Sequence, residues 1–464
     1  MSEAYAVVLA AGQGTRMKSK RHKVLHPVCG KPMVRHVLDS LQQAGIQRTL
    51  VVIGSLAEQV REELGEQVEF VYQNEQLGTG HAVMQAIPQL SGFEGTTLVC
   101  YGDTPLISAE TIRAMLSTHR EKGAAATVLT AIVDQPFGYG RIIRDTDGSV
   151  LRIVEEKDAT AEEKAVSEVN SGTYCFDNRA LLQALRQLDN NNAQKEYYLT
   201  DCLSIIRSQG LRVEAYTVQD SDEILGVNDR AQLAHVDGIL RRRIRLHHMK
   251  NGVSMVDPDS IYIDADVEIG ADTVLYPGTY LQRGTRIGSG CEIGPNVQIS
   301  QSTVGDYTAI KQAVLDSATI GNHVTMGPFT YIRPGTKIED GVKVGDFVEI
   351  KNSVIGKGSK VPHLAYVGDA DIGCHTNIGC GVITVNYDGV KKHRTVVGDH
   401  SFIGSNSNLV APVTVGDHAY VAAGSTITDS VPDGALAIAR ERQVTKEGYQ
   451  AKLEARLKER SLKK

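Results

Sequence analysis

The sequence predicts an α/β domain with a mostly parallel, Rossmann-like sheet, followed by a left-handed parallel β-helix. Two patterns carry this prediction. Between about residues 263 and 427 an aliphatic residue returns every six positions, often followed by Gly, whereas the first half alternates strand-like and helix-like segments. A period of six fits neither a helix nor a simple strand and is typical of hexapeptide β-helices, and the alternation indicates an α/β fold.

The six-residue register runs from Ile269 to Ile378 and resumes from Val397 to Ile427. Each repeat is expected to form a short strand that sends one aliphatic side chain inward, while a small residue or Gly turns the corner. With three faces in each coil, the register predicts about nine coils. An ordinary β-sandwich is the alternative, but it would show period-two strands with turns every 8 to 12 residues or so.

The register pauses between Ile378 and Val397, in a segment that is polar and basic in its second half. This segment is too long to be a corner. We therefore expect a loop that leaves the β-helix and touches a ligand or a neighbouring chain, since regular coils need no such loop.

Length and composition set further limits. A chain of 464 residues should hold two or three domains, which we place at 1–229, 230–250 as a linker helix, and 251–464. The net charge of -6 argues against general binding of nucleic acid. Seven cysteines without CxxC spacing indicate neither a disulfide framework nor a zinc site. We expect a cytoplasmic protein, since neither a signal peptide nor a membrane-spanning run is found.

The first strand, residues 5–10, leads into a basic loop with glycines at 12 and 14. Glycines let backbone N–H groups approach an anion, and Arg16 and Lys23 add positive charge, so the loop suits a polyphosphate. It lacks the P-loop and the Rossmann dinucleotide motifs. A glycine turn with solvated basic side chains is the alternative interpretation.

Further strands are expected at 49–53, 68–72, 97–101 and 126–132, with helices near 33–44, 56–64, 79–87 and 108–120 between them. In such a fold, ligands bind beyond the carboxyl ends of the strands. Asp103 follows a buried strand immediately, which is the placement expected of a carboxylate that holds Mg²⁺ against phosphates. Its alternative role is to cap the helix after Pro105.

Residues 229–250 place Leu233, Val236, Leu240 and Ile244 on one face of a helix, which we expect to hold the two domains apart as a strut. Its run of arginines, 241–243 and 245, could suggest a nucleic-acid patch. A solvated face, or one paired with a domain, is the favoured interpretation because nothing else in the chain is strongly basic.

The β-helix also carries polar residues that a purely structural coil would not need. Arg333 and Lys351 are cations suited to a sugar phosphate. His363 can take a proton from an amine, as acyl transfer from a thioester to that amine requires. A lone His in a β-protein is otherwise more often structural.

Several motifs then resemble one family. LAAGQGTRM, KVLHPVCGKPM, QLGTGHAV, YGDTPL, GYGRIIRD, IVEEKD, EVNSGTY, EYYLTD and LGVNDR are similar to those of the sugar-1-phosphate nucleotidyltransferases. With the β-helix behind them, the chain from about 5 to 445 resembles the bacterial GlmU family of bifunctional enzymes. The resemblance implies acetyl transfer from acetyl-CoA to glucosamine-1-phosphate. Uridylyl transfer from UTP to N-acetylglucosamine-1-phosphate follows, in the synthesis of UDP-N-acetylglucosamine for peptidoglycan.

The resemblance also implies the residues of the uridylyl site. The nucleotide would meet Leu9, Ala10, Ala11, Gly12, Arg16, Lys23, Gln73, Gly78, Thr79, Tyr101 and Gly102. The amino sugar would be bound by Gly140, Glu155, Asn170 and Asn228. Mg²⁺ would be held by Asp103 and Asn228. No side-chain nucleophile is needed, because the attacking sugar phosphate is already an anion. One departure is His22, where many relatives carry Pro.

For acetyl transfer the resemblance makes His363 the general base. The acceptor would be bound by Arg333, Lys351, Tyr366, Asn377 and Asn386, and acetyl-CoA by Cys380, Tyr387, Ser405, Ala423 and Arg440. Cys380 is a departure, since the family often has Ala there. Hexapeptide acyltransferases place active sites between subunits, so a homotrimer is expected. After Val444 we expect a short basic amphipathic helix that packs on a neighbour or is disordered.

Two rival hypotheses remain at this point. One is a pyrophosphorylase for another sugar, with a β-helix that is only regulatory. The other is a non-catalytic subunit built from the same two modules, which would show a degraded metal site, whereas Asp103 and Asn228 are both present.

Overall fold

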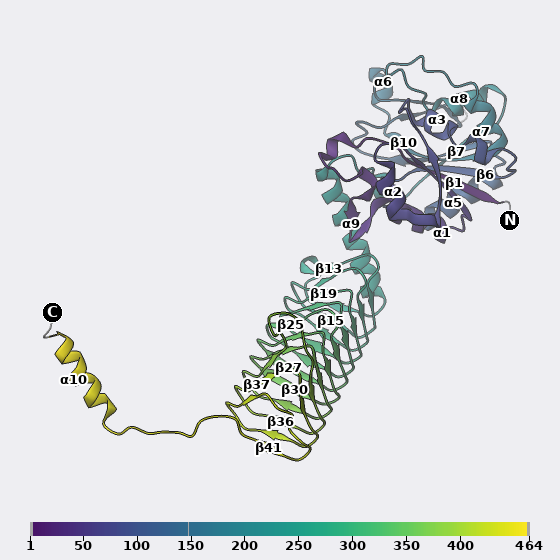
Figure 1. Ribbon diagram of the computed structural model, residues 1–464. Coiled ribbons are helices and arrows are strands. Elements are labelled where there is room, and N and C mark those ends of the chain that lie inside the picture. The colour runs from purple at the N-terminus through teal and green to yellow at the C-terminus, as the bar shows by residue number, and fades with distance from the viewer. Residues whose placement is uncertain (1–2, 147, 462–464) are drawn as a thin grey trace. The chain divides into compact units, whose positions relative to one another are not determined.

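The computed structural model describes residues 3–146 and 148–461, and it divides into two compact units (Figure 1). The first unit contains the residues up to His247 together with Ile263–Asp266. The second contains His248–Tyr262 and the residues from Val267 onward. No helix among the described residues is long and apolar enough to cross a membrane.

The first unit is built on a nine-stranded mixed sheet with the order β11-β7-β10-β6-β1-β4-β5 and a β8-β9 hairpin beside β10. Its strands are β1 (Ala4–Ala10), β4 (Arg48–Ile53), β5 (Glu69–Tyr72), β6 (Thr96–Tyr101), β7 (Ala126–Ile132), β8 (Arg141–Arg144), β9 (Val150–Val154), β10 (Glu168–Asp177) and β11 (Val213–Thr217). The strands expected from the sequence are all present. Between β6 and β7 lies β10, antiparallel to both, which the sequence analysis did not identify.

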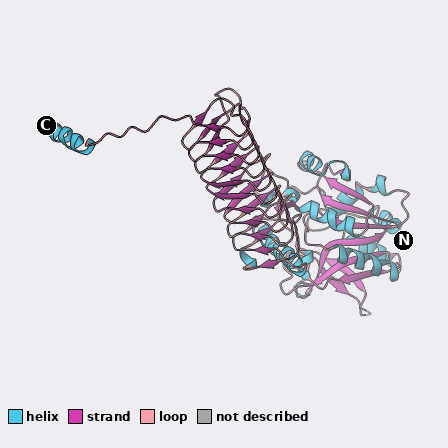
Figure 2. Cartoon of the chain, turned by 90° about the horizontal axis from the view of Figure 1, so that it is seen from below, coloured by secondary structure: helices cyan, strands magenta, loops and turns pink. Residues whose placement is uncertain are grey.

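Helices cover both faces of this sheet (Figure 2). They are α1 (Met33–Gln43), α2 (Ala57–Leu64), α3 (Thr79–Met84), α4 (Ile87–Leu90), α5 (Ala109–Glu121), α6 (Ala161–Lys164), α7 (Asn178–Leu185) and α8 (Asp201–Ser208). Alternation along β1 explains the two layers, since side chains of a strand point to opposite faces in turn. Val7 and Leu9 join the core with α3, α7 and α8, whereas Ala6 and Val8 join the core with α1, α2 and α5.

Helix α9 (Arg230–Lys250) confirms the helix predicted for this segment. Its apolar face is not free, however. Val236 and Ile239 are buried in a cluster with Met17, Val28 and Leu106 of the first unit. The segment expected to act as a strut therefore packs on the first unit, beside the small hairpin of β2 (Pro27–Val28) and β3 (Lys31–Pro32).

The second unit is the predicted left-handed parallel β-helix, with short strands stacked on three faces (Figure 2). Its first face consists of β12 (Ser254–Met255), β15 (Val274–Leu275), β18 (Glu292–Ile293), β21 (Ala309–Ile310), β24 (Thr325–Met326), β27 (Lys343–Asp346), β30 (Lys360–His363), β33 (Asn377–Ile378), β36 (Phe402–Ile403), β39 (Tyr420–Val421) and β41 (Leu436–Ala437). Each strand pairs in parallel with the one three strands further along the chain, so one coil makes three sides.

The other two faces follow the same order. The second face consists of β13 (Tyr262–Ile263), β16 (Tyr280–Leu281), β19 (Gln298–Ser300), β22 (Ala313–Asp316), β25 (Thr330–Ile332), β28 (Glu349–Lys351), β31 (Tyr366–Gly368), β34 (Ile383–Val385), β37 (Asn408–Val410) and β40 (Thr426–Ile427). The third consists of β14 (Glu268–Ile269), β17 (Arg286–Ile287), β20 (Thr303–Val304), β23 (Thr319–Ile320), β26 (Lys337–Ile338), β29 (Val354–Ile355), β32 (Ala370–Ile372), β35 (Thr395–Val397) and β38 (Val413–Val415).

The corners differ from expectation. Many are turned by a large residue with positive φ, not by Gly or a small residue, and neighbouring coils stack these side chains on one another. Phe329 lies on Phe347 with ring centroids 5.2 Å apart, and His375, His400 and His418 form a continuous stack. Contact between rings of successive coils offsets the strain of the left-handed backbone, so Gly is not required there.

The pause in the register is shorter than predicted. Strand β34 continues the second face with Thr384 pointing inward, where its hydroxyl accepts a hydrogen bond from the Gly368 N–H at 2.7 Å. The search for aliphatic residues every six positions missed this repeat because its inward residue, Thr384, is polar. The loop proper spans residues 386–394 and is closed by a bridge between Tyr387 and Lys392.

Beyond the β-helix, α10 (Tyr449–Ser461) is the helix expected in the tail, and it buries no residue.

Truncating one inward side chain should destabilise the β-helix. Ile350 is fully buried in β28, so we expect Ile350→Ala to lower the free energy of unfolding of this unit by about 2 to 5 kcal/mol. Urea unfolding followed by circular dichroism measures the change. Val390→Ala is the control because Val390 is 88% exposed in the loop, and equal effects of the two variants would contradict the packing assigned to Ile350.

Candidate functional site

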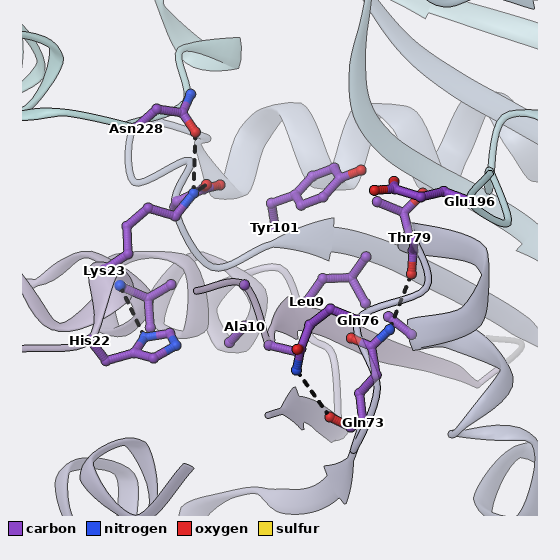
Figure 3. A pocket seen from close by; sticks show the side chains of 16 residues that line it. Leu9, Ala10, His22, Lys23, Gln73, Gln76, Thr79, Tyr101, Glu196 and Asn228 are labelled. Atoms are coloured by element: carbon purple, nitrogen blue, oxygen red, sulfur yellow. Dashed lines mark hydrogen bonds and ion pairs between the residues drawn. The ribbon is translucent and has the colours of Figure 1, made fainter. Parts of the chain in front are cut away.

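A cavity of about 340 Å³ lies at the carboxyl ends of β1 and β6 in the first unit (Figure 3). The residues that line it are Leu9, Ala10, Ala11, Gly12, His22, Lys23, Val24, Gln73, Gln76, Gly78, Thr79, Ala82, Tyr101, Asp103, Glu196 and Asn228. Most of the residues expected to meet the nucleotide are therefore brought together. The sequence analysis did not assign His22, Val24, Gln76, Ala82 or Glu196 to this site.

The glycine loop that follows β1 forms one wall of this cavity. A Cβ added to Gly12 would meet no protein atom within 4 Å, so the missing side chain leaves open space beside the backbone. Gly14 has a φ of +59°, and a Cβ there would lie 2.7 Å from Cβ of Lys23. Gly14 is thus needed for the turn that lets Lys23 face the cavity, while Gly12 leaves room for an anion.

His22 is 1% exposed and lies in the same wall. Its Nδ1 accepts a hydrogen bond from the backbone N–H of Val24 at 3.3 Å, which caps the 3₁₀ turn Lys23–Leu25. Burial, reinforced by the charge of Lys23, lowers the pKa of His22 from 6.5 to about 4. The imidazole is therefore neutral at physiological pH and adds no charge to the loop.

Four polar side chains meet at one end of the cavity. Lys23 Nζ forms an ion pair with Asp103 Oδ2 and donates to Asn228 Oδ1 at 3.3 Å. Arg16 Nη2 also donates to Asn228 Oδ1, at 2.9 Å. The Val227 N–H donates to the Asp103 carbonyl at 3.0 Å, and this bond holds the two chain segments together.

The chemistry of this donor set fits a divalent cation. A carboxylate and an amide oxygen converge on one positively charged atom, here the ammonium of Lys23, and such oxygens are the protein ligands that Mg²⁺ prefers. The described residues contain no cluster of three or more His, Cys, Asp or Glu side chains, so phosphate oxygens and water would have to complete the coordination.

The opposite end of the cavity has a narrow backbone slot. A Cβ on Gly78 would lie 2.7 Å from the Tyr197 carbonyl, and Gly78 has a φ of +109°, so no other residue fits without strain. Gln73 Nε2 donates to the Gly78 carbonyl at 3.2 Å. Thr79 accepts the Leu199 N–H at 3.2 Å. These contacts hold the amide of Gln73 at the edge of the slot, where a planar base can be read.

Of the four residues expected to read the sugar, Gly140, Glu155 and Asn170 form a group of their own next to the cavity, whereas Asn228 lies with Lys23 and Asp103. The Asn170 N–H donates to the Gly140 carbonyl at 2.9 Å, and a Cβ on Gly140 would lie 3.5 Å from Glu155 Oε2. Burial raises the pKa of Glu155. Tyr101 lines the cavity and also packs against Gly172, two residues after Asn170, where an added Cβ would overlap its ring. Tyr101 therefore lies between this group and the cavity. Gly102 does not line the cavity, but its N–H donates to the Leu9 carbonyl.

The second unit gathers cations at the corner between its second and third faces. Arg333 forms an ion pair with Glu349 at 2.7 Å. Lys351 lies beside Lys392 of the 386–394 loop, whose proximity lowers the pKa of Lys351. Two ammonium groups in contact are unfavourable unless an anion lies between them. Lys392 is a candidate ligand that the sequence analysis missed, because the loop brings it back to this corner.

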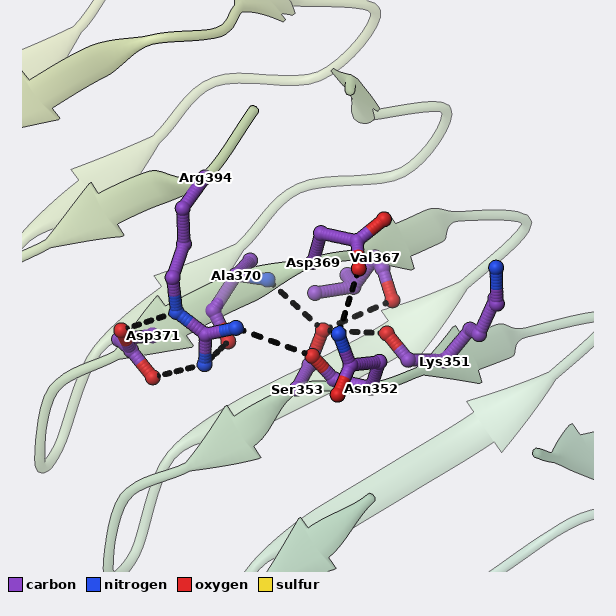
Figure 4. Close-up of polar contacts among 8 residues, drawn as sticks. All are labelled: Lys351, Asn352, Ser353, Val367, Asp369, Ala370, Asp371 and Arg394. Carbon is purple, nitrogen blue, oxygen red and sulfur yellow. Dashed lines mark hydrogen bonds and ion pairs between the residues drawn. The ribbon is translucent and has the colours of Figure 1, made fainter. Parts of the chain in front are cut away.

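Asp369 lies near Lys351, and Figure 4 shows its bond to Asn352. It accepts hydrogen bonds from Asn352 at 2.6 Å and from Asn386 at 2.5 Å. Burial raises the pKa of Asp369, but these bonds and the two lysines outweigh burial and lower it overall. Asn386 also donates to the Tyr366 hydroxyl at 3.4 Å, which fixes the start of the loop against β31.

His363 lies at a different corner, between the first and second faces, with its Nδ1 2.6 Å from Asp346 Oδ1. Parallel pairing continues from this strand to β33, β36 and β39 on the same face. The residues expected to contact acetyl-CoA follow this column upward. The Cys380 carbonyl accepts a hydrogen bond from the Asn406 N–H, and the Ser405 carbonyl accepts one from the Gly424 N–H. A Cβ on Gly424 would lie 3.6 Å from Arg440 Cδ.

Two expected residues lie apart from these groups. Asn377 pairs with Lys360 on the first face, whereas the other expected acceptor residues belong to the second face or to the loop. Tyr387 is exposed on the loop, and its hydroxyl donates to the Gly389 carbonyl at 2.7 Å. The described chain therefore brings neither of them to the cations at Lys351.

Comparison with known proteins addresses both halves. Residues 6–200 match the model of the MobA-like NTP transferase domain, and residues 266–301, 317–352 and 394–429 match that of the bacterial transferase hexapeptide. Curated relatives named Bifunctional protein GlmU include those of Geobacillus thermodenitrificans, 57% identical over 99% of this chain and 100% of the relative, and Brevibacillus brevis, 55% identical over 99% and 100%. The relative of Enterococcus faecalis is 52% identical over 98% and 99%.

The chain belongs to the GlmU family. It is a bifunctional transferase, with a nucleotidyltransferase half and a hexapeptide-repeat acyltransferase half. Both rival hypotheses are therefore wrong, since each assigned no chemistry to the β-helix.

Acid should destabilise the first unit through His22. A neutral imidazole in the folded state keeps its full contribution above the unfolded pKa of 6.5 and loses it as the pH falls toward about 4. We expect the free energy of unfolding to fall by up to about 1.4 kcal/mol per pH unit in this window relative to His22→Asn, which retains an acceptor for the Val24 N–H. Urea unfolding at several pH values measures this, and parallel profiles for both proteins would refute the burial effect.

Proposed function

We propose that this protein makes UDP-N-acetylglucosamine in two steps. The second unit transfers the acetyl group of acetyl-CoA to glucosamine-1-phosphate, and the first unit then transfers the uridylyl group of UTP to N-acetylglucosamine-1-phosphate and releases pyrophosphate. The observation that carries this proposal is the convergence of Lys23, Asp103 and Asn228 at one end of a nucleotide-sized cavity. The second step needs charge neutralisation there and no protein nucleophile.

In uridylyl transfer, the sugar phosphate attacks the α-phosphorus of UTP, and the bond to pyrophosphate breaks. Asp103 and Asn228 would hold Mg²⁺, which supplies positive charge to the phosphates. Lys23, released from Asp103 when the cation binds, would neutralise the leaving pyrophosphate together with Arg16. Gln73 and Gly78 would read the uracil, and Glu155 and Asn170 would bind the amino sugar.

In acetyl transfer, the ammonium of glucosamine-1-phosphate must first lose a proton to His363. The free amine then attacks the thioester carbonyl, the N–C bond forms, the C–S bond breaks, and CoA leaves as the thiol. Arg333, Lys351 and Lys392 lie at another corner of the chain, so they would neutralise the sugar phosphate at the His363 of a neighbouring subunit. Acetyl-CoA would lie along the corner column that contains Cys380, Ser405 and Ala423, with Arg440 at its end.

The assembled protein would be a cytoplasmic homotrimer that serves peptidoglycan synthesis. The proposed domains are 1–229 for uridylyl transfer, 230–250 as a linker helix, and 251–464 for acetyl transfer. Exposed Phe329, Phe347 and Leu364 form an apolar strip beside His363, which a second copy would cover. Asn377 and Tyr387 would then reach the acceptor or acetyl-CoA of a neighbouring subunit's site.

Two substitutions should separate the activities. We expect Asp103→Asn to lower pyrophosphate release by at least about 100-fold, because the metal loses its one carboxylate ligand, while thiol release from acetyl-CoA is unchanged. His363→Ala should do the reverse, since the amine loses its base. Coupled assays for pyrophosphate and for free thiol on the same preparations measure both, and each activity is the folding control for the other. Loss of both activities in either properly folded variant would oppose two independent sites.

Sedimentation tests the assembly. We expect equilibrium sedimentation to give about three times the chain mass of 50.2 kDa. Phe347→Lys should lower the mass and the acetyl transfer rate together, because it places a charge in the strip, and should spare uridylyl transfer. A monomer with full acetyl transfer activity would contradict the homotrimer.

A further inference from the structure

We propose that Asp346 is a positioning residue for acetyl transfer: its carboxylate keeps the proton of His363 on Nδ1, so that Nε2 is free to accept a proton from the sugar amine. This inference rests on the proposed role of His363 as general base. Nothing in the sequence pattern marks Asp346, which reads as one more polar corner residue of a hexapeptide repeat.

The pair is set by the backbone. Asp346 and His363 are direct partners in the parallel ladder of β27 and β30, 17 residues and one coil apart. The Leu364 N–H donates to the Asp346 carbonyl at 2.9 Å, and a Cβ on Gly345 would overlap the Pro362 carbonyl. The two coils are thus in close main-chain contact at this corner, and the side chains meet because the backbone register puts them there.

The side-chain geometry selects one tautomer. His363 Nδ1 is 2.6 Å from Asp346 Oδ1, a distance typical of a charge-assisted hydrogen bond. An ionised carboxylate can only accept, so Nδ1 must carry the proton and Nε2 of the neutral ring must be unprotonated. The His363 side chain is 59% exposed, which leaves the ring accessible to a substrate.

Electrostatics point the same way. The hydrogen bond from His363 is the main cause that lowers the pKa of Asp346, so the carboxylate is charged throughout the physiological range. A fixed negative charge favours the imidazolium that forms when the ring takes the proton of the amine. The other titratable side chains on the two paired strands are those of Lys343 and Lys360, so these strands place no second carboxylate beside the pair.

Among the residues that the structure describes, Asp346 bonds to no side chain other than that of His363. The coil above it is held by main-chain bonds, and inward Val344 supplies the packing of its strand. If Asp346 had only a structural role, its replacement would lower the free energy of unfolding. A positioning Asp346 would change the pH dependence of one activity.

The test compares Asp346→Asn, which keeps an acceptor oxygen but no charge, with Asp346→Ala, which removes both. For acetyl transfer we expect kcat/KM to fall roughly 10- to 100-fold in both variants, mostly in kcat, and its acidic limb to move to lower pH because the imidazolium loses its counter-charge. Pyrophosphate release should be unchanged. Glu292→Gln removes an exposed carboxylate from the same face at β18 and should leave every quantity at the wild-type value.

Nitrogen-15 NMR of the imidazole gives a readout that does not need activity. In the neutral ring, we expect His363 to carry its proton on Nδ1 in the wild type and mainly on Nε2 in Asp346→Ala. An unchanged tautomer together with an unchanged pH profile would overturn the inference. If His363→Ala retained acetyl transfer, the proposed base itself would be wrong, which is a different outcome from a shifted profile in the Asp346 variants.

Discussion

Main-chain pairing between successive coils is the constraint on which the acyltransferase half depends. Each short strand bonds to the strand one coil away, so the side chains at a corner form columns that persist along the β-helix. Asp346, His363 and the residues above them belong to one such column. A base, its anionic partner and a slot for a long ligand can therefore be aligned by hydrogen bonds that no side chain makes.

The nucleotidyltransferase half aligns the side chains of its site in a different way. Its site is assembled from segments that are distant in sequence, and the sheet brings them together at the carboxyl ends of β1 and β6. One backbone bond, from Val227 to Asp103, joins the end of the domain to its middle and places Asn228 beside the carboxylate. Lys23 meanwhile balances the charge of Asp103, so the oxygens stay together without a metal.

Neutral groups matter as much as charged ones in that cavity. His22 is buried beside Lys23 and is kept uncharged by that burial, so the loop gains shape without added repulsion. Gly12 and Gly78 matter because they have no side chain: Gly12 leaves space for a ligand, and Gly78 lets the Tyr197 carbonyl approach its backbone. In the β-helix the balance is reversed, because Lys351 and Lys392 are held together and an anion would relieve their repulsion.

The sequence by itself determined the two fold classes, because hydrophobic periodicity reports directly which side chains a repeating backbone buries. It also predicted the positions of Asp103 and His363, which sit beside recognisable strands. It could not identify Thr384 as a core position, since a polar inward residue breaks the pattern and is satisfied by bonds to the backbone of Gly368 and Tyr366. Asp346, Lys392 and Glu196 were decided by tertiary structure alone: each becomes part of a site only when a neighbouring coil, a returning loop or a distant segment folds against it.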